Sequence, residues 1–222
     1  MAPLGTIYTY TPSPRLVKAQ AAANLNGQEL VIAPDFQFGK TNKTEEYLSK
    51  FPTGKVPAFE GADGTNLIES DAIAQYCAES GPAAGQLMGS TPSQRAQIRQ
   101  WICFAQGEIL DNVQTLALWR MKIYPYNEAS EKSAMTKLTR ALGVLETYLK
   151  GRTWLVDGEK ISMADITVAS SLIWGFSMII DAEMRQKHPT LMAWYERVIE
   201  VDGVKEAFGP QNYIEKRQDT PE

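Results

Sequence analysis

The chain has 222 residues, a length that suits either one large domain or two domains of ordinary size. Its 22 Lys and Arg residues against 26 Asp and Glu residues give a net charge of −4, so the sequence offers no basic field for phosphate backbones or anionic lipids. We therefore expect a protein that binds neither nucleic acid nor a membrane.

The distribution of apolar residues points to a soluble protein. The longest uncharged run, residues 166–180, is interrupted by Ser and Gly and falls short of the roughly 20 residues that a bilayer span requires. The N-terminus lacks a basic region followed by an apolar stretch, and two cysteines are too few for a secreted disulfide framework. We expect a cytoplasmic location.

Residue types for metal or triad chemistry are scarce. The single histidine, His188, precedes Pro189 and an amphipathic run, which favours a helix start over a catalytic base. Cys77 and Cys103 each lie in an apolar helical pattern, where buried free thiols act as small hydrophobic side chains. No CxxC, HExxH, GxGxxG or GxxxxGK[ST] motif is present, so we expect no metal, Rossmann or P-loop site.

Short β-rich runs alternate with helical patterns over the first eighty residues. Residues 5–10 predict a strand that ends at two prolines, and residues 15–25 predict a helix. Residues 29–33 predict a second strand, which a right-handed crossover would place parallel to the first. The beginning of the chain is thus predicted to form a βαβ unit.

A loop and a short helix are expected next, the helix over residues 45–50. Two apolar runs, residues 56–59 and 67–68, flank a strong turn signal at residues 61–64 and predict a β-hairpin.

A third helix completes the order βαβαββα. Either Ser70 or Asp71 could cap its first turn. We assign residues 1–81 to this α/β domain, because the small residues and the proline of residues 81–89 predict a linker. Residues 91–222 show only helical periodicity and predict an all-α domain.

Two long helices and one buried helix are predicted in the second part. Apolar residues at steps of three and four over residues 98–116 indicate a helix of about 30 residues, and residues 135–149 indicate an antiparallel neighbour. Ser162 and Asp165 form a capping-box pattern. The helix that follows, to about Phe176, is apolar nearly all round and should lie at the centre.

Three segments, found in the expected order, resemble the glutathione transferase superfamily: residues 54–59, 67–73 and 154–165. The resemblance implies a glutathione transferase fold, with a thioredoxin-like N-terminal domain and an all-helical C-terminal domain. It also implies a homodimer that uses glutathione as a co-substrate, with no metal. Residues 5–8 and 124–127 look closest to the transferase-like N-terminal domain of the gamma subunit of elongation factor 1, particularly in fungi.

The resemblance also implies where glutathione would bind. This anionic tripeptide needs a strand edge and groups that capture its terminal charges. A cis bond between Val56 and Pro57 would offer the edge, while Ser70 and the adjoining helix N–H groups would bind the γ-glutamyl carboxylate and Glu69 the ammonium group. The candidates for the glycyl carboxylate are Lys40, Asn42 and Lys55. Purely structural roles, in caps and solvated loops, would leave the same sequence pattern.

Catalysis in this family depends on a donor that stabilises the glutathione thiolate, because a free thiol with a pKa of roughly 8.5 stays mostly protonated at neutral pH. The resemblance places the donor at the end of the first strand. Aligning Arg15 with the basic residue of theta-like members puts Thr11 at their serine position, with Tyr10 and Ser13 as close alternatives. We expect Thr11 to face the thiol and Arg15 to raise the local potential, unless this turn only shapes the strand end.

The second substrate should meet an apolar wall where Phe104, Trp119 and Tyr124 gather, although aromatic residues at helical spacing are more often core. Trp101 and Trp194 are expected in the core. Two functions remain open. One is a glutathione transferase that conjugates glutathione to a small electrophile or reduces a hydroperoxide. The other is a non-catalytic scaffold that binds the nucleotide-exchange subunit of elongation factor 1 in translation.

Overall fold

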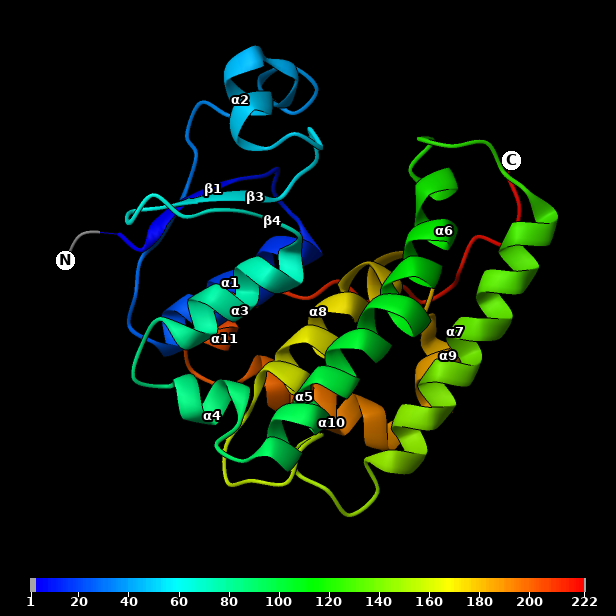
Figure 1. Ribbon diagram of the computed structural model, residues 1–222. Coiled ribbons are helices and arrows are strands. Elements are labelled where there is room, and N and C mark those ends of the chain that lie inside the picture. Colours follow the sequence, from blue (N-terminus) through cyan, green and yellow to red (C-terminus); the bar gives the residue numbers. More distant parts are fainter. Residues whose placement is uncertain (1–2, 222) are drawn as a thin grey trace.

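The computed structural model describes residues 3–221. Figure 1 shows a small sheet with its helices beside a larger group of helices. Within the described residues, no helix combines the length and the apolar character needed to cross a membrane.

A four-stranded mixed sheet forms the first part, in the order β2-β1-β3-β4. The first strand pairs parallel with the second and antiparallel with the third, and the third pairs antiparallel with the fourth. The βαβ unit and the hairpin predicted from the sequence are both confirmed. The strands are β1 (Gly5–Tyr8), β2 (Leu30–Ile32), β3 (Ala58–Gly61) and β4 (Asn66–Ile68).

Helices cover both faces of this sheet. In Figure 1, α1 and α3 lie on one face and α2 on the other. The predicted linker at residues 81–89 is wrong in part, because it contains a short helix, α4, whose Leu87 is buried. The helix bounds are α1 (Pro14–Leu25), α2 (Glu45–Lys50), α3 (Ser70–Glu79) and α4 (Ala84–Met88), with a 3₁₀ turn at Thr41–Lys43.

The first long helix of the second part is continuous over residues 92–120, as predicted, but its middle turn widens into a π-helix. A capping box between Thr91 and Gln94 begins it. Its neighbour runs in the opposite direction along it (Figure 1), which confirms the antiparallel pair. These elements are α5 (Pro92–Phe104), η2 (Ala105–Leu110), α6 (Asp111–Arg120) and α7 (Glu128–Tyr148).

The predicted central helix is α8 (Met163–Met178), and nearly all of its side chains are buried. Asp165 reaches back to Ser162, whose N–H and hydroxyl both donate to its carboxylate at 3.2 and 3.1 Å. His188 takes the N-cap position of α10, as its sequence context predicted. The remaining helices are α9 (Ala182–Gln186), α10 (Pro189–Ile199) and α11 (Val204–Phe208).

Most buried apolar side chains form one cluster that runs from the sheet through α1 into the helical part. Trp101 and Trp194 belong to it, as expected. A smaller cluster surrounds Tyr47 and Phe51. Because α1 packs on α3 on one side and on α8 and α11 on the other, the two parts share a core, and their division at residues 81–91 stays a prediction.

Candidate functional site

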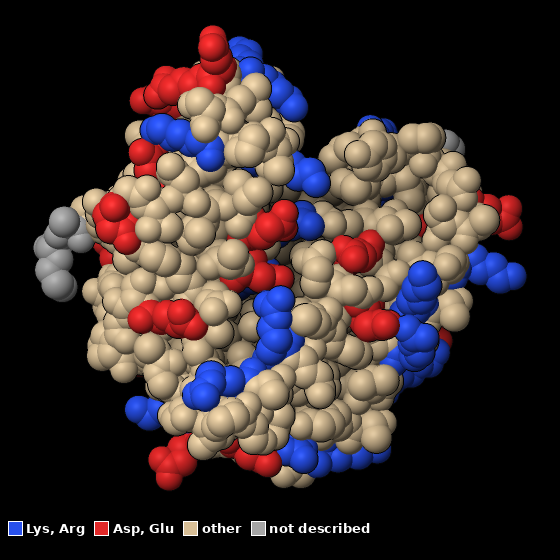
Figure 2. Space-filling model, viewed as in Figure 1, with Lys and Arg blue, Asp and Glu red and all other residues tan. Residues whose placement is uncertain are grey.

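A cleft of about 680 Å³ opens where the sheet part meets the segment after α6. Figure 2 shows this hollow between the upper-left and right-hand lobes, with charged side chains on its walls. The lining includes eight of the predicted site residues: Tyr10, Arg15, Asn42, Lys55, Val56, Pro57, Glu69 and Ser70. Thr11, Ser13 and Lys40 are not part of it.

The Val56–Pro57 peptide bond is cis, as the resemblance implied, and it immediately precedes β3. The neighbouring backbone is held by side chains, because the Tyr47 hydroxyl donates to the Lys55 carbonyl at 2.8 Å. Asn42 is only 2% exposed, and its amide donates to the Gly54 carbonyl at 2.7 Å. The Asn42 amide thus ties down the cleft wall that it lines, and its predicted contact with the glycyl carboxylate stays a prediction.

The N-terminus of α3 forms another wall of the cleft. Ser70 is the first residue of this helix, and Glu69 occupies the N-cap position without a side-chain capping bond, so neither Ser70 nor Asp71 is the cap as predicted. Glu69 has a φ of 70°, a sparsely populated conformation for a residue other than glycine. Ser70 and Glu69 both line the cleft, so the start of α3, where the first N–H groups lack intrahelical partners, borders it.

The three candidate thiol donors are placed differently. Tyr10 lines the cleft, with its ring edge-to-face against Phe38 at 5.6 Å. Thr11 is exposed on a bend, and Ser13 is 3% exposed at the N-cap of α1. The expectation that Thr11 faces the thiol is therefore not supported, because β1 ends at Tyr8 and the chain bends before α1 begins.

Two lysines line the cleft: Lys55, as predicted, and Lys43, which the sequence analysis missed. Lys40 does not line the cleft: it precedes the 3₁₀ turn, at the end of which Lys43, itself exposed, reaches the cleft wall. The only sequence signal for Lys43 was its position beside Asn42.

The predicted aromatic wall is formed in part: Trp119 and Tyr124 line one cavity beside α6, and Phe104 does not join them. Phe104 packs on Trp101 at 5.2 Å within the helical part. Trp119 is buried against Tyr126, and its ring N–H donates to Glu131 at 2.7 Å. Tyr124 alone of the three predicted residues lines the cleft, and it is 63% exposed.

A buried ion pair that the sequence did not reveal lies beside the cleft. Lys18, in the middle of α1, pairs with Asp71 in the first turn of α3, and the Lys18 side chain is 3% exposed. Burial lowers the pKa of Lys18, and the Asp71 carboxylate opposes this shift. The pair joins α1 to the helix start that presents Ser70.

The two thiols differ in exposure. Cys77 is buried in α3, and burial raises its pKa to about 12. Cys103 is exposed on α5, so its predicted burial was wrong; the position lies on the outer side of the helix. Within residues 3–221 there is no group of three or more His, Cys, Asp or Glu side chains that could hold a metal ion.

We expect one thiol per native chain to react with a disulfide reagent such as DTNB. The Cys103 sulfur is accessible, whereas Cys77 is enclosed and stays protonated at neutral pH. Release of thionitrobenzoate measures the reaction, and Cys103→Ser should abolish it until a denaturant is added. Rapid labelling of native Cys103→Ser would contradict the burial of Cys77.

Two family models match the chain. One, described as the glutathione S-transferase N-terminal domain, matches residues 3–79, and the other, the glutathione S-transferase C-terminal domain, matches residues 109–202.

Full-length relatives and a solved structure are also similar to this chain. A glutathione S-transferase-like protein from Fusarium sp is 50% identical over 98% of this chain and 99% of its own length. Elongation factor 1-gamma from Homo sapiens is 39% identical over 96% of this chain but 48% of its own, so the chain spans about half of that relative. The crystal structure of the GST-like domain of elongation factor 1-gamma from Saccharomyces cerevisiae covers 100% of both chains at 26% identity, with a TM-score of 0.84.

Proposed function

Because the chain belongs to the glutathione S-transferase family, we propose that its cleft binds glutathione and stabilises the thiolate for reaction with a small electrophile or a hydroperoxide. In conjugation, the sulfur forms a bond to the electrophilic carbon, and either a leaving group departs with its bonding electrons or the adduct takes a proton. In peroxide reduction, the sulfur takes the terminal oxygen and releases an alcohol, and a second glutathione then forms the disulfide and water.

The charge arrangement of the cleft carries this proposal. The N-terminus of α3 and Ser70 suit the γ-glutamyl carboxylate, and Glu69 beside them suits its ammonium group. Lys43 and Lys55 also line the cleft and could bind the glycyl carboxylate. The backbone of Val56, shortly before β3, lines the same cleft and would pair with the cysteinyl part.

We assign the thiolate donor to Tyr10, because it is the one of the three candidates that lines the cleft. Arg15 supports it with positive charge from the start of α1. A hydroxyl that donates to the thiolate favours the ionised form and so lowers the thiol pKa. This proposal includes a homodimeric protein in the cytoplasm. Size-exclusion chromatography of the purified chain tests whether it forms a dimer.

Glutathione titration by calorimetry tests the proposed site. We expect Ser70→Ala and Glu69→Gln each to weaken binding about tenfold, because each removes one hydrogen bond to a charged group of the ligand. Glu79→Gln, at the other end of α3, changes a side chain that accepts a hydrogen bond from Gln75, and this variant should bind like wild type. Absence of glutathione binding to the wild type would refute the proposed function.

A scaffold function is the second candidate, and the elongation factor 1-gamma relatives favour it. The cleft and the outer helical faces lie on different parts of the surface, so a bound exchange subunit and bound glutathione are compatible. Pull-down with a purified nucleotide-exchange subunit of elongation factor 1 tests this function. Failure of that subunit to bind at micromolar concentration would exclude it.

A further inference from the structure

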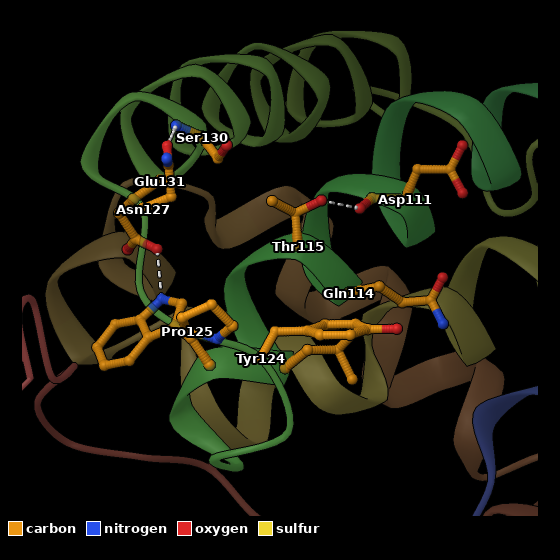
Figure 3. A pocket seen from close by; sticks show the side chains of 10 residues that line it. Asp111, Gln114, Thr115, Tyr124, Pro125, Asn127, Ser130 and Glu131 are labelled. Atoms are coloured by element: carbon orange, nitrogen blue, oxygen red, sulfur yellow. Dashed lines mark hydrogen bonds between the residues drawn. The ribbon is translucent and has the colours of Figure 1, made fainter.

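One hydrogen bond joins the two parts of the molecule beside the cleft. Arg15, near the start of α1, donates to the side-chain oxygen of Gln114, on α6, at 3.0 Å. Arg15 lines the cleft, and Gln114 lines a cavity of about 450 Å³ that shares Tyr124 with the cleft. Figure 3 shows the Gln114 amide at the end of this cavity where the Tyr124 ring lies. The helical part of the chain therefore holds an arginine that belongs to the sheet part.

Arg15 occupies an unfavourable position in its own helix. It lies in the first turn of α1, and that turn holds no acidic residue. The unpaired N–H groups of a first turn give this end of a helix a partial positive charge, which disfavours a cation there. A local choice of this kind, with no compensation within the helix, is typical of a functional site. An anion bound in the cleft would provide the compensation.

The hydrogen-bond partner of Arg15 is neutral, in contrast to the partners of two buried cations on the same two helices. Lys18, on α1, pairs with Asp71, and Arg120, on α6, pairs with Glu131 at 2.7 Å. Within residues 3–221, no carboxylate lies within ion-pair distance of Arg15. An amide oxygen accepts a hydrogen bond without cancelling the charge of the donor. The guanidinium is thus oriented and keeps its charge for an anion in the cleft.

The charges at the starts of α1 and α3 act on one another. Burial lowers the pKa of Lys18, and the charge of Arg15 lowers it further. The carboxylates of Asp71 and Glu69 oppose this shift. In the proposed site, Asp71 is already paired with Lys18, and Glu69 meets the ammonium group of the ligand. Arg15 is then left to act on the sulfur.

We propose that Gln114 is a positioning residue for the proposed reaction: it holds the Arg15 guanidinium in the cleft without neutralising it, so that the guanidinium stabilises negative charge on the glutathione sulfur. This inference rests on the proposed function. It predicts that a carboxylate at position 114 would abolish the preference of the cleft for an anion at the sulfur position.

Two glutathione analogues that differ at the sulfur test the inference without requiring turnover. Glutathione sulfonate carries a sulfonate in place of the thiol, and S-methylglutathione carries a neutral thioether. Both keep the terminal charges of glutathione, so the ratio of their affinities in calorimetry reports the electrostatic potential at the sulfur position. General damage to the site would weaken both ligands and leave the ratio unchanged.

Gln114→Glu should lower the preference for glutathione sulfonate about tenfold. The new side chain has nearly the same shape, but its carboxylate pairs with Arg15 and cancels the charge. Gln97→Glu is the matched control: this glutamine on α5 also makes a neutral hydrogen bond, to the Ser93 hydroxyl at 3.2 Å, and it lines neither the cleft nor the adjoining cavity. An equal change of the ratio in both variants, or no change in either, would overturn the inference.

Gln114→Leu distinguishes an effect through Arg15 from a direct effect of residue 114 on the ligand. The substitution removes the acceptor without a change of charge, so Arg15 loses its fixed orientation, and the preference for the sulfonate should fall about threefold. In an Arg15→Gln background, the same substitution should leave the ratio unchanged. An equal fall in both backgrounds would refute the positioning role.

The failure of the inference and the failure of the proposed function give different results. If both analogues bind and the Gln114 substitutions leave the ratio unchanged, the glutathione site stands and the positioning role is refuted. If neither glutathione nor either analogue binds to the wild type, both the inference and the proposed function are refuted.

Discussion

Asp165→Ala should lower the free energy of unfolding by about 4 kcal/mol, a large part of the roughly 5–15 kcal/mol of a typical domain. The carboxylate is fully buried at the start of α8 and accepts from Leu155 N–H at 2.8 Å, from the Trp194 ring at 3.0 Å and from Ser162. Removal of the carboxylate leaves these buried donors without an acceptor, and each costs about 1–3 kcal/mol. Urea unfolding followed by circular dichroism measures the change.

Asp157→Ala is the matched control for this substitution. Asp157 pairs with Arg152, but its side chain is 83% exposed, so its loss should cost less than about 1 kcal/mol. Asp165→Asn keeps one acceptor oxygen and should fall between the two. If the urea midpoint of Asp165→Ala equals that of Asp157→Ala, the buried carboxylate does not stabilise the contacts of α8 with its neighbours.

Asp71→Asn should destabilise the protein more than Lys18→Met does. The Lys18 side chain is 3% exposed, so its charge stays buried without a partner once Asp71 is neutral, whereas the Asp71 side chain, 25% exposed, can be hydrated when Lys18 is replaced. Removal of one partner from a buried pair typically costs about 3–5 kcal/mol, and we expect Asp71→Asn to approach that range and Lys18→Met to remain near 1 kcal/mol. Urea midpoints of the two variants give the order.

The double variant Lys18→Met/Asp71→Leu distinguishes the charge pair from simple packing. An apolar pair of similar volume should recover most of the stability, because no charge remains buried. Glutathione titration of the same variant shows whether the pair also positions Ser70 in the neighbouring turn of α3. If Lys18→Met proves more destabilising than Asp71→Asn, the contrast in burial does not govern the energetics of this pair.

The order of the secondary structure could be derived from the sequence because its signals are local. Prolines after β1, the turn at residues 61–64 and the apolar period over residues 98–116 each act through neighbouring residues. The two segments around Pro57 and Ser70 likewise identified two walls of the cleft. The sequence could not reveal α4 within residues 81–89, since small residues and a proline give no helical period, and this helix depends on the packing of Leu87.

Details of the site depended on contacts between distant residues. Lys43 rather than Lys40 lines the cleft because a 3₁₀ turn rotates the chain between them, and Tyr10 rather than Thr11 lines it because the strand ends early. Asn42 looked like a free loop amide, yet it bonds to Gly54, twelve residues away.

The family, the order of elements and the segments that make the cleft could thus be predicted from local signals, because propensity, turn chemistry and motif spacing act over a few residues. Packing between distant elements sets which side chains face the cleft, buries Lys18 against Asp71, and forms a second cavity at Tyr124. Side-chain direction and burial depend on how α1, α3 and α6 pack against one another, and no local signal carries that information.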